Sequence, residues 1–551
     1  MKHLTLDDVI HITGQFGRSQ KIYYFGISLL QFFIAPHMLL NVFTGLEPTF
    51  HCSPKDVIPK HGATLNRSDS LLNECIDNDV QKCRIIYTSQ YKSFASEWNL
   101  ICSEKYKVAL VQSVWMFGVM TGALVLGGLA DIIGRLRTLM LALLGTIAFE
   151  GFSAFAPTYT VMVVFRFLGG ICCSLIIVAS FVLSQELVGM EWRSFCGMLL
   201  SMFFALGIAV FSALSAIVSD WRTLTLICSV MGIAFLVFPC YIPESPRWLA
   251  SQGRNDEAKA VLEGMAMKNM TLDKLPKQWN LPSVVSNLSK KQPKGICLLF
   301  SHSYVALITL ILIFSWFVNS ATYYGLTMAA SDLGGNVYVS TALNGLVEIP
   351  SGLVAMFMID RLGRRITLCG FMLFGGVACL CIQLLPASLV TLTTLFALLG
   401  KLSISSSFAA IYIFSGEIFP TMIRNSGMGI MSVAARIGGM LAPFILMLGD
   451  VAPNLQFTAL GLLTFSSGLL NLKLPETLGQ PMPETIADIL AFRKASKTVH
   501  HGKYNKLETE DVEADKDTLS RSPSPRRTTE EPAAADDLAP LIVENTESRW
   551  S

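Results

Sequence analysis

Charged residues are scarce in this sequence of 551 residues. Asp, Glu, Lys and Arg together account for 15% of the chain, whereas 52% of the residues are hydrophobic and the mean hydropathy is +0.51. Soluble globular domains contain about 25% charged residues, so this composition excludes a soluble protein of several domains. The net charge is only +2, which indicates neither a nucleic-acid partner nor an acidic one.

Motifs for nucleotide and metal chemistry are also missing. The sequence contains no GxxxxGK[ST] phosphate-binding loop and no group of Cys and His residues with the spacing of a zinc site. We therefore expect no ATPase module, no metal centre, no other cofactor and no enzymatic activity. The first apolar run, which starts after Lys21, is long and has no small-residue cleavage site, so we expect no cleaved signal peptide.

Long apolar segments make up most of the chain instead. A helix needs roughly 20 residues to cross a bilayer, and about twelve segments reach or approach that length. We therefore predict an all-α membrane protein with twelve transmembrane helices. The expected spans are approximately 22–46, 107–130, 138–156, 160–184, 195–218, 222–242, 303–325, 337–359, 366–385, 389–415, 426–448 and 455–474.

Three motifs occur twice, about 230 residues apart. GGLADIIGRLR at 127–137 returns as MFMIDRLGRR at 356–365, SQELVGMEWRS as SGEIFPTMIRN, and PES at 243–245 as PET at 475–477. One offset for three motifs predicts two homologous halves of six helices, at 22–242 and 303–474. The linker 243–302 joins them and has an expected helix at 253–269, where the apolar residues share one face.

Basic residues in short loops predict the orientation, because Lys and Arg favour the cytoplasmic side. They follow the second and eighth spans, whereas Arg222 is the exception among the opposite turns. We therefore expect both ends of the chain, 1–21 and 475–551, in the cytoplasm of a plasma-membrane protein, with a largely disordered tail. The basic residues concerned are Arg135, Arg137, Arg361, Arg364 and Arg365.

The segment 47–106 is then a large extracellular loop between the first two spans. Four cysteines in an oxidising compartment suggest two disulfides of undetermined connectivity; unpaired thiols are the alternative. Asn66 begins an Asn-Arg-Ser sequon, for which we expect glycosylation. The disulfide candidates are Cys52, Cys75, Cys83 and Cys102.

The duplicated charged motifs are candidates for a conformational gate. Two similar bundles can rock about a central site, and Glu186 with Arg193 and Glu417 with Arg424 are expected to form ion pairs across the bundles at the inner face. The alternative is that these charges only set the topology. The complete set of candidates is Asp131, Gly134, Arg135, Arg137, Glu186, Arg193, Asp360, Arg361, Gly363, Arg364, Glu417 and Arg424.

Arg436 is a lone charge halfway along GIMSVAARIGGMLAPFI at 429–445. A guanidinium at the centre of a bilayer costs from about 3 to more than 10 kcal/mol, so it must face protein or water. The small residues Gly438 and Gly439 let a neighbouring helix or a ligand approach it. It could pair with Glu348 structurally, or it could bind a substrate carboxylate through its planar fork.

The motifs together resemble those of a known family. GGLADIIGRLR and IDRLGRR resemble the two copies of the major facilitator superfamily signature. SEWNLIC, RFLGG, PESPRWLASQGR, GEIFPTMIRNSGMG and LPETLGQPMPETI resemble the solute carrier 22 family of organic cation, anion and zwitterion transporters, over approximately residues 10–490. The resemblance implies two pseudo-symmetric six-helix bundles, with an extracellular loop domain between helices 1 and 2.

The resemblance also implies a substrate path. Cation carriers of the family tend to have Asp where this chain has Arg436, and anion carriers usually add a lysine where it has Gly352. A path with one acid and at least one base favours zwitterions, and the run from YYGLT to VEIPS resembles the carnitine and ergothioneine branch. The residues that would line or border the path are Phe204, Tyr323, Tyr324, Glu348, Lys401 and Arg436.

We therefore expect a carrier of small organic zwitterions, and secondarily of organic cations, that works by alternating access. Its partners would be the organic ion and the lipid bilayer. The alternatives are an organic anion exchanger and a sensor that keeps the carrier fold without transporting. The coupling ion and the oligomeric state stay open.

Overall fold

In the computed structural model, the residues described are 2–54, 71–72, 83–89, 91–276, 279–281, 295–331, 335–386, 388–479, 483 and 489. The described residues belong to one compact unit, Met1–Ser496. Asn66, Cys75 and the tail after 489 lie outside the described residues. The predicted glycosylation, the complete disulfide pattern and the disordered tail therefore stay predictions.

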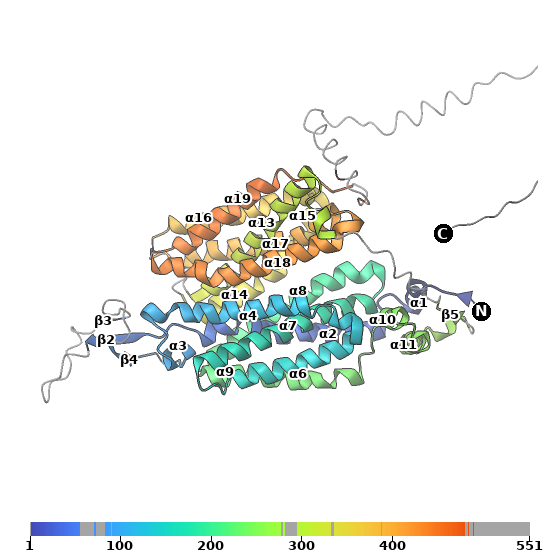
Figure 1. Cartoon of the computed structure of the whole chain (residues 1–551), viewed down its shortest axis with the longest axis horizontal. Helices are drawn as coiled ribbons and strands as arrows, with labels where there is room; N and C mark the ends of the chain where they lie inside the picture. The colour runs from blue at the N-terminus through green and yellow to red at the C-terminus, as the bar shows by residue number, and fades with distance from the viewer. Residues whose placement is uncertain are drawn as a thin grey trace, which may run out of the picture. The chain divides into compact units, whose positions relative to one another are not determined.

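Two bundles of long helices lie side by side (Figure 1). The N-terminal half contains α2 (Arg18–Thr44), α4 (Tyr106–Val125), α5 (Leu129–Ile133), α6 (Arg135–Ser153), α7 (Tyr159–Leu187), α8 (Arg193–Ile217), α9 (Trp221–Val230) and the 3-10 helix η6 (Met231–Cys240). The C-terminal half contains α13 (Ser303–Met328), α14 (Val337–Leu346), α15 (Glu348–Leu362), α16 (Arg364–Gln383), α17 (Val390–Ile418), α18 (Thr421–Leu446) and α19 (Leu455–Asn471).

Eleven segments of the described chain are long and apolar enough to cross a membrane. The twelfth predicted span is α19, whose 17 residues are about 25 Å long and pack against α13 and α16. The prediction of a twelve-helix membrane protein is confirmed. The eighth span is interrupted at Val347, because Pro350 cannot accommodate the carbonyl of the residue four positions earlier, where α14 ends.

One end of the bundles carries a small unit that we call the platform, and we call this end the platform end (Figure 1). Strand β1 pairs in parallel with β5, and Ile10, Trp248, Leu262 and Trp279 are buried in a shared core. Helix α11 confirms the helix predicted at 253–269. The elements of the platform are β1 (Lys2–His3), α1 (Leu6–Thr13), α10 (Pro246–Ser251), α11 (Asn255–Lys268), η7 (Leu272–Lys274) and β5 (Trp279–Asn280).

The opposite end, which we call the loop end, carries residues of the predicted extracellular loop. Strand β2 (Phe50–Pro54) lies between β3 (Leu71–Leu72) and β4 (Cys83–Tyr87) in an antiparallel sheet, and α3 (Phe94–Glu97) follows. Cys52 and Cys102 each take part in a disulfide bond. Arg222, the exception among the turns, forms an ion pair with Glu97 at 2.5 Å, so its charge is compensated locally.

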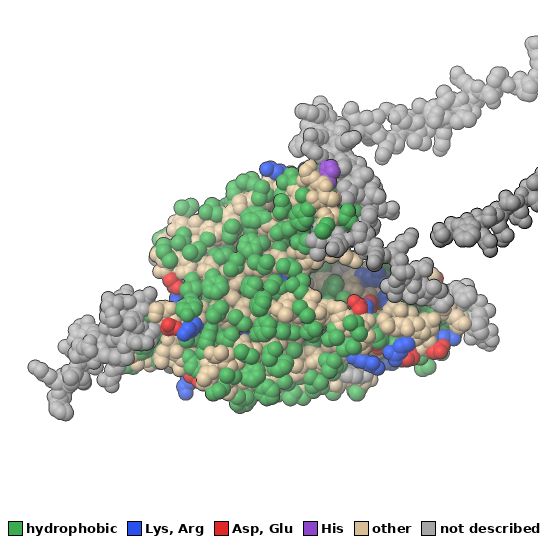
Figure 2. Space-filling model, in the orientation of Figure 1, with side chains coloured by type: hydrophobic (Ala, Val, Ile, Leu, Met, Phe, Trp, Pro, Cys, Tyr) green, Lys and Arg blue, Asp and Glu red, His purple; other side chains and the backbone are tan. Residues whose placement is uncertain are grey.

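The two halves contact each other near the loop end. Lys105 at the start of α4 pairs with Asp450 after α18 at 2.7 Å, and the Ser113 hydroxyl donates to the carbonyl of Met440 at 2.7 Å. The Ser212 hydroxyl donates to a carbonyl of α14 at 2.5 Å. Figure 2 shows a hollow between the halves on the side of the platform. The interior is therefore closed toward the loop end and open toward the platform end.

Candidate functional site

Three helices of the C-terminal half bring an acid, a base and a tyrosine together. Lys401 Nζ of α17 lies 2.9 Å from Glu348 Oε1 of α15, and the Tyr323 hydroxyl of α13 donates to the same oxygen at 2.5 Å. Lys401 also donates to Thr327 Oγ1 at 2.7 Å and lies 3.2 Å from the centroid of the Tyr323 ring. The side chain of Lys401 is 0% exposed and that of Glu348 is 9% exposed. The two charges therefore compensate each other inside the bundle.

This geometry corrects one alternative from the sequence. A structural pair between Glu348 and Arg436 is wrong for this structure, because Lys401 occupies the position beside the carboxylate. Lys401 was predicted to border the path, but the sequence does not reveal that α15 and α17 face each other at this level. The partner of a buried acid depends on which neighbouring helix approaches it.

Arg436 of α18 consequently does not pair with Glu348. Among the residues that the structure describes, no acid forms an ion pair with it, and its Nε is buried without a hydrogen-bond partner. Tyr324 and Tyr412 lie within electrostatic range of the guanidinium. Arg436 is half-buried, and a cation that is partly removed from water without a counter-ion is costly; an anionic ligand would offset that cost.

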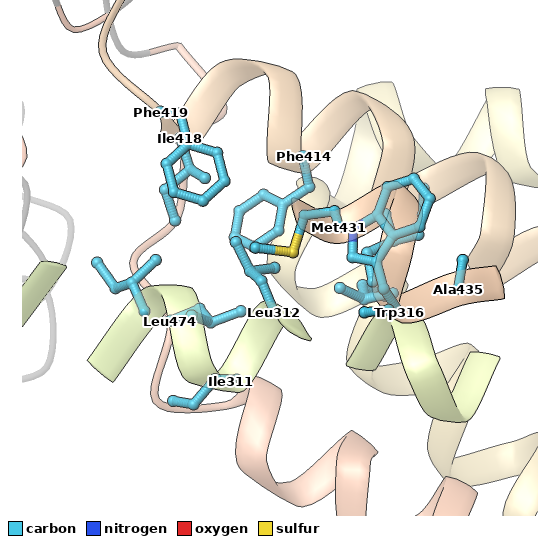
Figure 3. Close-up of a cluster of buried hydrophobic side chains, with 14 of the residues drawn as sticks. Ile311, Leu312, Trp316, Phe414, Ile418, Phe419, Met431, Ala435 and Leu474 are labelled. Atoms are coloured by element: carbon cyan, nitrogen blue, oxygen red, sulfur yellow. The ribbon is translucent and has the colours of Figure 1, made fainter. Parts of the chain in front are cut away.

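The position of Arg436 is set by close packing of α18 on α13. A Cβ atom at Gly438 would lie 2.2 Å from the carbonyl oxygen of Phe317, and one at Gly439 would lie 2.9 Å from the Tyr324 ring. The expectation that small residues let a neighbouring helix approach is confirmed. Figure 3 shows the buried cluster to which α18 contributes Met431 and Ala435, with the Met431 side chain directed toward Phe414 of α17 and Leu312 of α13.

Aromatic rings of α13 and α17 form a continuous wall beside the charges. Tyr412 contacts Trp316 edge to face at 4.4 Å between ring centroids, and Phe408 lies 5.9 Å from Trp316 and 5.7 Å from Tyr323. Trp316 is 1% exposed, whereas Tyr412 is 49% exposed. Tyr412 also lies within electrostatic range of Arg436.

Sequence reasoning missed this aromatic wall. Phe408 and Tyr412 follow Lys401 by two and three helical turns, which places all three side chains on one face of α17. That spacing was the signal that could have identified them.

Phe204 is contributed by the N-terminal half. It packs against a cluster that contains Tyr324 and Ala442 of the C-terminal half and Met38 of α2, and Tyr323 packs against the same cluster. The Tyr324 hydroxyl lies 3.7 Å from Met38 Sδ. The six predicted path residues therefore lie together where the halves meet, and both tyrosines point inward.

The first copy of the charged motif forms a compact network at the platform end. Arg135 lies 3.0 Å from Glu186 and 2.9 Å from Asp131. Glu244 accepts hydrogen bonds from the backbone N–H of Arg135 at 3.0 Å and from the next N–H at 3.1 Å, where the start of α6 favours an anion. Gly134 has φ +113°, and a Cβ there would lie 2.5 Å from Glu244, so this turn requires glycine.

The second copy repeats this network. Arg364 lies 3.1 Å from Glu417 and 3.7 Å from Asp360, and Glu476 accepts from the first two backbone N–H groups of α16 at 2.8 and 3.1 Å. Gly363 has φ +92°, and a Cβ atom added there would lie 2.7 Å from Glu476. The repeated spacing in the sequence therefore corresponds to repeated contacts in space.

The predicted ion pairs across the bundles are wrong for this structure. Glu186 lies on α7, which packs against α6 of its own half, and Glu417 lies on α17, which packs against α16. Arg193 lies 3.7 Å from Asp7 of the platform, and Arg424 donates to the carbonyl of Phe419 at 3.2 Å. Glu186 pairs with Arg135, the first residue of α6, and Glu417 pairs with Arg364, the first residue of α16. Each glutamate therefore finds its partner on the adjacent helix of its own half.

Two acids of these networks were missed as candidates. Glu244 and Glu476 were noticed only as part of the PES and PET repeat, although their recurrence was the signal for a shared role. The remaining basic candidates, Arg137 and Arg361, are exposed, and the Arg361 guanidinium lies 4.2 Å from the ring centroid of Phe357.

Comparisons with known proteins decide the family. The family described as Sugar (and other) transporter matches residues 61–487. Solute carrier family 22 member 15-like from Xenopus laevis is 35% identical over 490 residues, which cover 88% of this chain and 96% of that protein. The chain belongs to the solute carrier 22 family, within the transporters described by that family model.

Other relatives of this solute carrier 22 protein carry different substrate names. Organic cation transporter protein from Drosophila melanogaster is 34% identical over 89% of this chain and 95% of its own length. Organic anion transporter 3 from Sus scrofa is 30% identical over 90% of this chain and 95% of its own length. The protein is therefore a multi-pass membrane transporter and not an enzyme.

Solved structures agree with the fold. The inward-open xylose transporter XylE from E. coli superimposes with a TM-score of 0.56 at 15% identity, over 84% of this chain and 97% of that one. This likeness supports the major facilitator fold and carries no information about the substrate.

Proposed function

We propose that this solute carrier 22 protein transports small organic zwitterions, such as carnitine or ergothioneine, with organic cations as a second substrate class. The observation that carries the proposal is that one of the two cations of the site has a counter-ion and the other has none among the described residues. Lys401 is compensated by Glu348 at 2.9 Å, whereas Arg436 has no counter-ion among the described residues. A substrate carboxylate would supply the missing charge.

The two ends of a zwitterion match different parts of the site. The guanidinium of Arg436 can bind a carboxylate through two parallel hydrogen bonds, which a lysine cannot do. The wall of Tyr412, Phe408 and Tyr323 offers ring faces to an ammonium or to a flat ring, each worth about 0.5–2 kcal/mol. An organic cation without a carboxylate would use the aromatic wall alone.

Organic anion transport is the second candidate, and the Glu348–Lys401 pair favours it. With Glu348 neutralised, the site carries the net positive charge of Arg436, and a monovalent anion would balance it. The relatives are named for organic cations as well as organic anions. The two candidates differ in whether a substrate needs a positive group.

Alternating access would connect this site to each side of the membrane in turn. We place the loop end outside the plasma membrane, with a glycosylated Asn66, and both ends of the chain in the cytoplasm. The halves close toward the loop end and open toward the platform, which supports an inward-facing state. The networks around Arg135 and Arg364 would hold each half rigid while the halves rock.

The test is uptake by oocytes that express wild type, Arg436→Ala or Lys473→Ala. Lys473 is an exposed cation in the turn after α19 and controls for the loss of one positive charge. The panel contains labelled carnitine, ergothioneine, para-aminohippurate and tetraethylammonium, with surface expression measured in parallel.

We expect Arg436→Ala to lose the carboxylate-bearing substrates and to retain at least part of the tetraethylammonium uptake, whereas Lys473→Ala behaves as wild type. If the wild type takes up para-aminohippurate but neither carnitine nor ergothioneine, zwitterion transport is contradicted and organic anion transport takes its place. A parallel fall of all substrates in Arg436→Ala, at normal surface expression, would make this residue a structural strut. No uptake by wild type would favour the non-transporting sensor.

A further inference from the structure

Three charges meet where the two halves touch at the loop end. Lys105 belongs to the N-terminal half and directly precedes α4. Its Nζ lies 2.7 Å from Asp450 Oδ1 of the C-terminal half and 2.8 Å from Glu47 Oε2, which follows α2 in its own half. Lys105 therefore links one carboxylate within its half to one across the interface.

Asp450 is placed by the helix that carries Arg436. It ends η9 (Met447–Asp450), which continues α18. The contact between α4 and α18 also contains the hydrogen bond from Ser113 to Met440 at 2.7 Å. A movement of α18 away from α4 would therefore break the Lys105–Asp450 pair and leave the Lys105–Glu47 pair intact.

We propose that Lys105 and Asp450 are the outer gate of this carrier, whose ion pair holds the loop end closed and breaks when the path opens there. Glu47 keeps the ammonium paired after Asp450 has moved, so opening does not leave a lone charge at the membrane surface. Lys105 and Asp450 act on the position of the helices and are positioning residues. The inference rests on the proposed alternating access.

The exposure of these side chains sets how much the removal of the Lys105–Asp450 pair should shift the equilibrium between the closed and open states. The side chains of Lys105, Asp450 and Glu47 are 32%, 45% and 53% exposed, so the pair across the halves is partly screened by water and salt. Removing an exposed pair shifts an equilibrium by about two- to fivefold. We expect the population that is open at the loop end to increase by that factor.

The experiment measures how fast a membrane-impermeant thiol reagent modifies a Ser113→Cys reporter on the α4–α18 contact, without substrate present. The chain without the reporter gives the background from its own cysteines. Asp450→Asn removes the carboxylate across the halves. Glu47→Gln is the matched control, because it removes a carboxylate at nearly the same distance from the same ammonium within one half.

We expect labelling of the reporter to become about two- to fivefold faster with Asp450→Asn and not to become faster with Glu47→Gln, because Glu47 also pairs with Lys105 in the open state. The exchange Lys105→Asp with Asp450→Lys keeps one ammonium and two carboxylates, and it should restore slow labelling. The proposed gate would be contradicted if Asp450→Asn left the labelling rate unchanged, or if Glu47→Gln increased it as much as Asp450→Asn does.

Failure of the proposed function would look different. Labelling is measured without substrate and does not depend on which substrate is carried. An uptake panel that contradicts zwitterion transport would therefore leave the labelling result and the proposed gate unaffected. A loop end on the cytoplasmic side would make the reporter reactive only in permeabilised cells. That outcome would overturn the proposed orientation, and the comparison of variants in permeabilised cells would still decide the gate.

Discussion

Replacing Glu348 by glutamine tests the charge balance of the site. The variant leaves Lys401, which is 0% exposed, without its counter-ion, and breaking a buried ion pair from one side costs about 3–5 kcal/mol. The contacts of Lys401 with Thr327 and the Tyr323 ring remain and offset about 1–2 kcal/mol of this cost. We therefore expect Glu348→Gln to lower stability by about 2–3 kcal/mol.

The reverse variant should be milder. Lys401→Met leaves Glu348 with its hydrogen bond from Tyr323 and with 9% exposure to water, so we expect a cost of about 1–2 kcal/mol. The double variant Glu348→Gln/Lys401→Met removes both charges. Because neither group is then left uncompensated, it should be more stable than Glu348→Gln alone.

The assay is the melting temperature of each purified variant in detergent, with surface expression in cells as a second measure. A loss of 2–3 kcal/mol should lower the melting temperature by about 5–10 °C if the C-terminal half melts as a unit of about 170 residues. The reasoning would be refuted by equal melting temperatures of Glu348→Gln and wild type, or by a double variant that is no more stable than Glu348→Gln.

Three further predictions concern helix packing, the loop end and the aromatic wall. Gly438→Ala should lower the melting temperature by several degrees, because its Cβ would collide with a backbone carbonyl, whereas Gly429→Ala on the same helix, with nothing within 4 Å, should not. Partial burial raises the pKa of Glu97, but hydrogen bonds from Arg222 and Trp221 outweigh it and lower this pKa below its ordinary value. The pair should therefore stabilise the protein at neutral pH by up to about 1 kcal/mol. The melting difference between wild type and Glu97→Gln should stay constant from pH 7.5 to 6 and disappear only as the pH falls through the lowered pKa. Tyr412→Ala should raise the KM for aromatic and cationic substrates severalfold with unchanged surface expression, whereas an unchanged KM would exclude Tyr412 from the path.

The arrangement of charges narrows what the site can carry. With Glu348 paired to Lys401 and no acid paired to Arg436 among the described residues, the proposed site would carry a net charge of +1, in contrast to a site where Glu348 stands alone and attracts cations. Variants that separate Glu348 from Lys401 should therefore change selectivity as well as stability. This relation makes Lys401 as informative as Arg436 for the choice between zwitterions and anions.

Much of the architecture follows from local patterns in the chain. The length of each apolar segment predicts a span, the recurrence of three motifs predicts two halves, and a lone arginine in α18 suggests a functional position. These signals are local because helix length and helix faces depend on residues within a few turns of each other. They also predict α11 and the close packing at Gly438.

Only the tertiary structure decided which charges meet. Lys401, and not Arg436, neutralises Glu348, and Glu186 binds Arg135 of its own half instead of closing the inner face. The sequence specifies each residue on its own helix, whereas ion pairs depend on how neighbouring helices approach and rotate. For the same physical reason, the aromatic wall around Tyr412 and the contact of Lys105 with Asp450 became visible only in the folded chain.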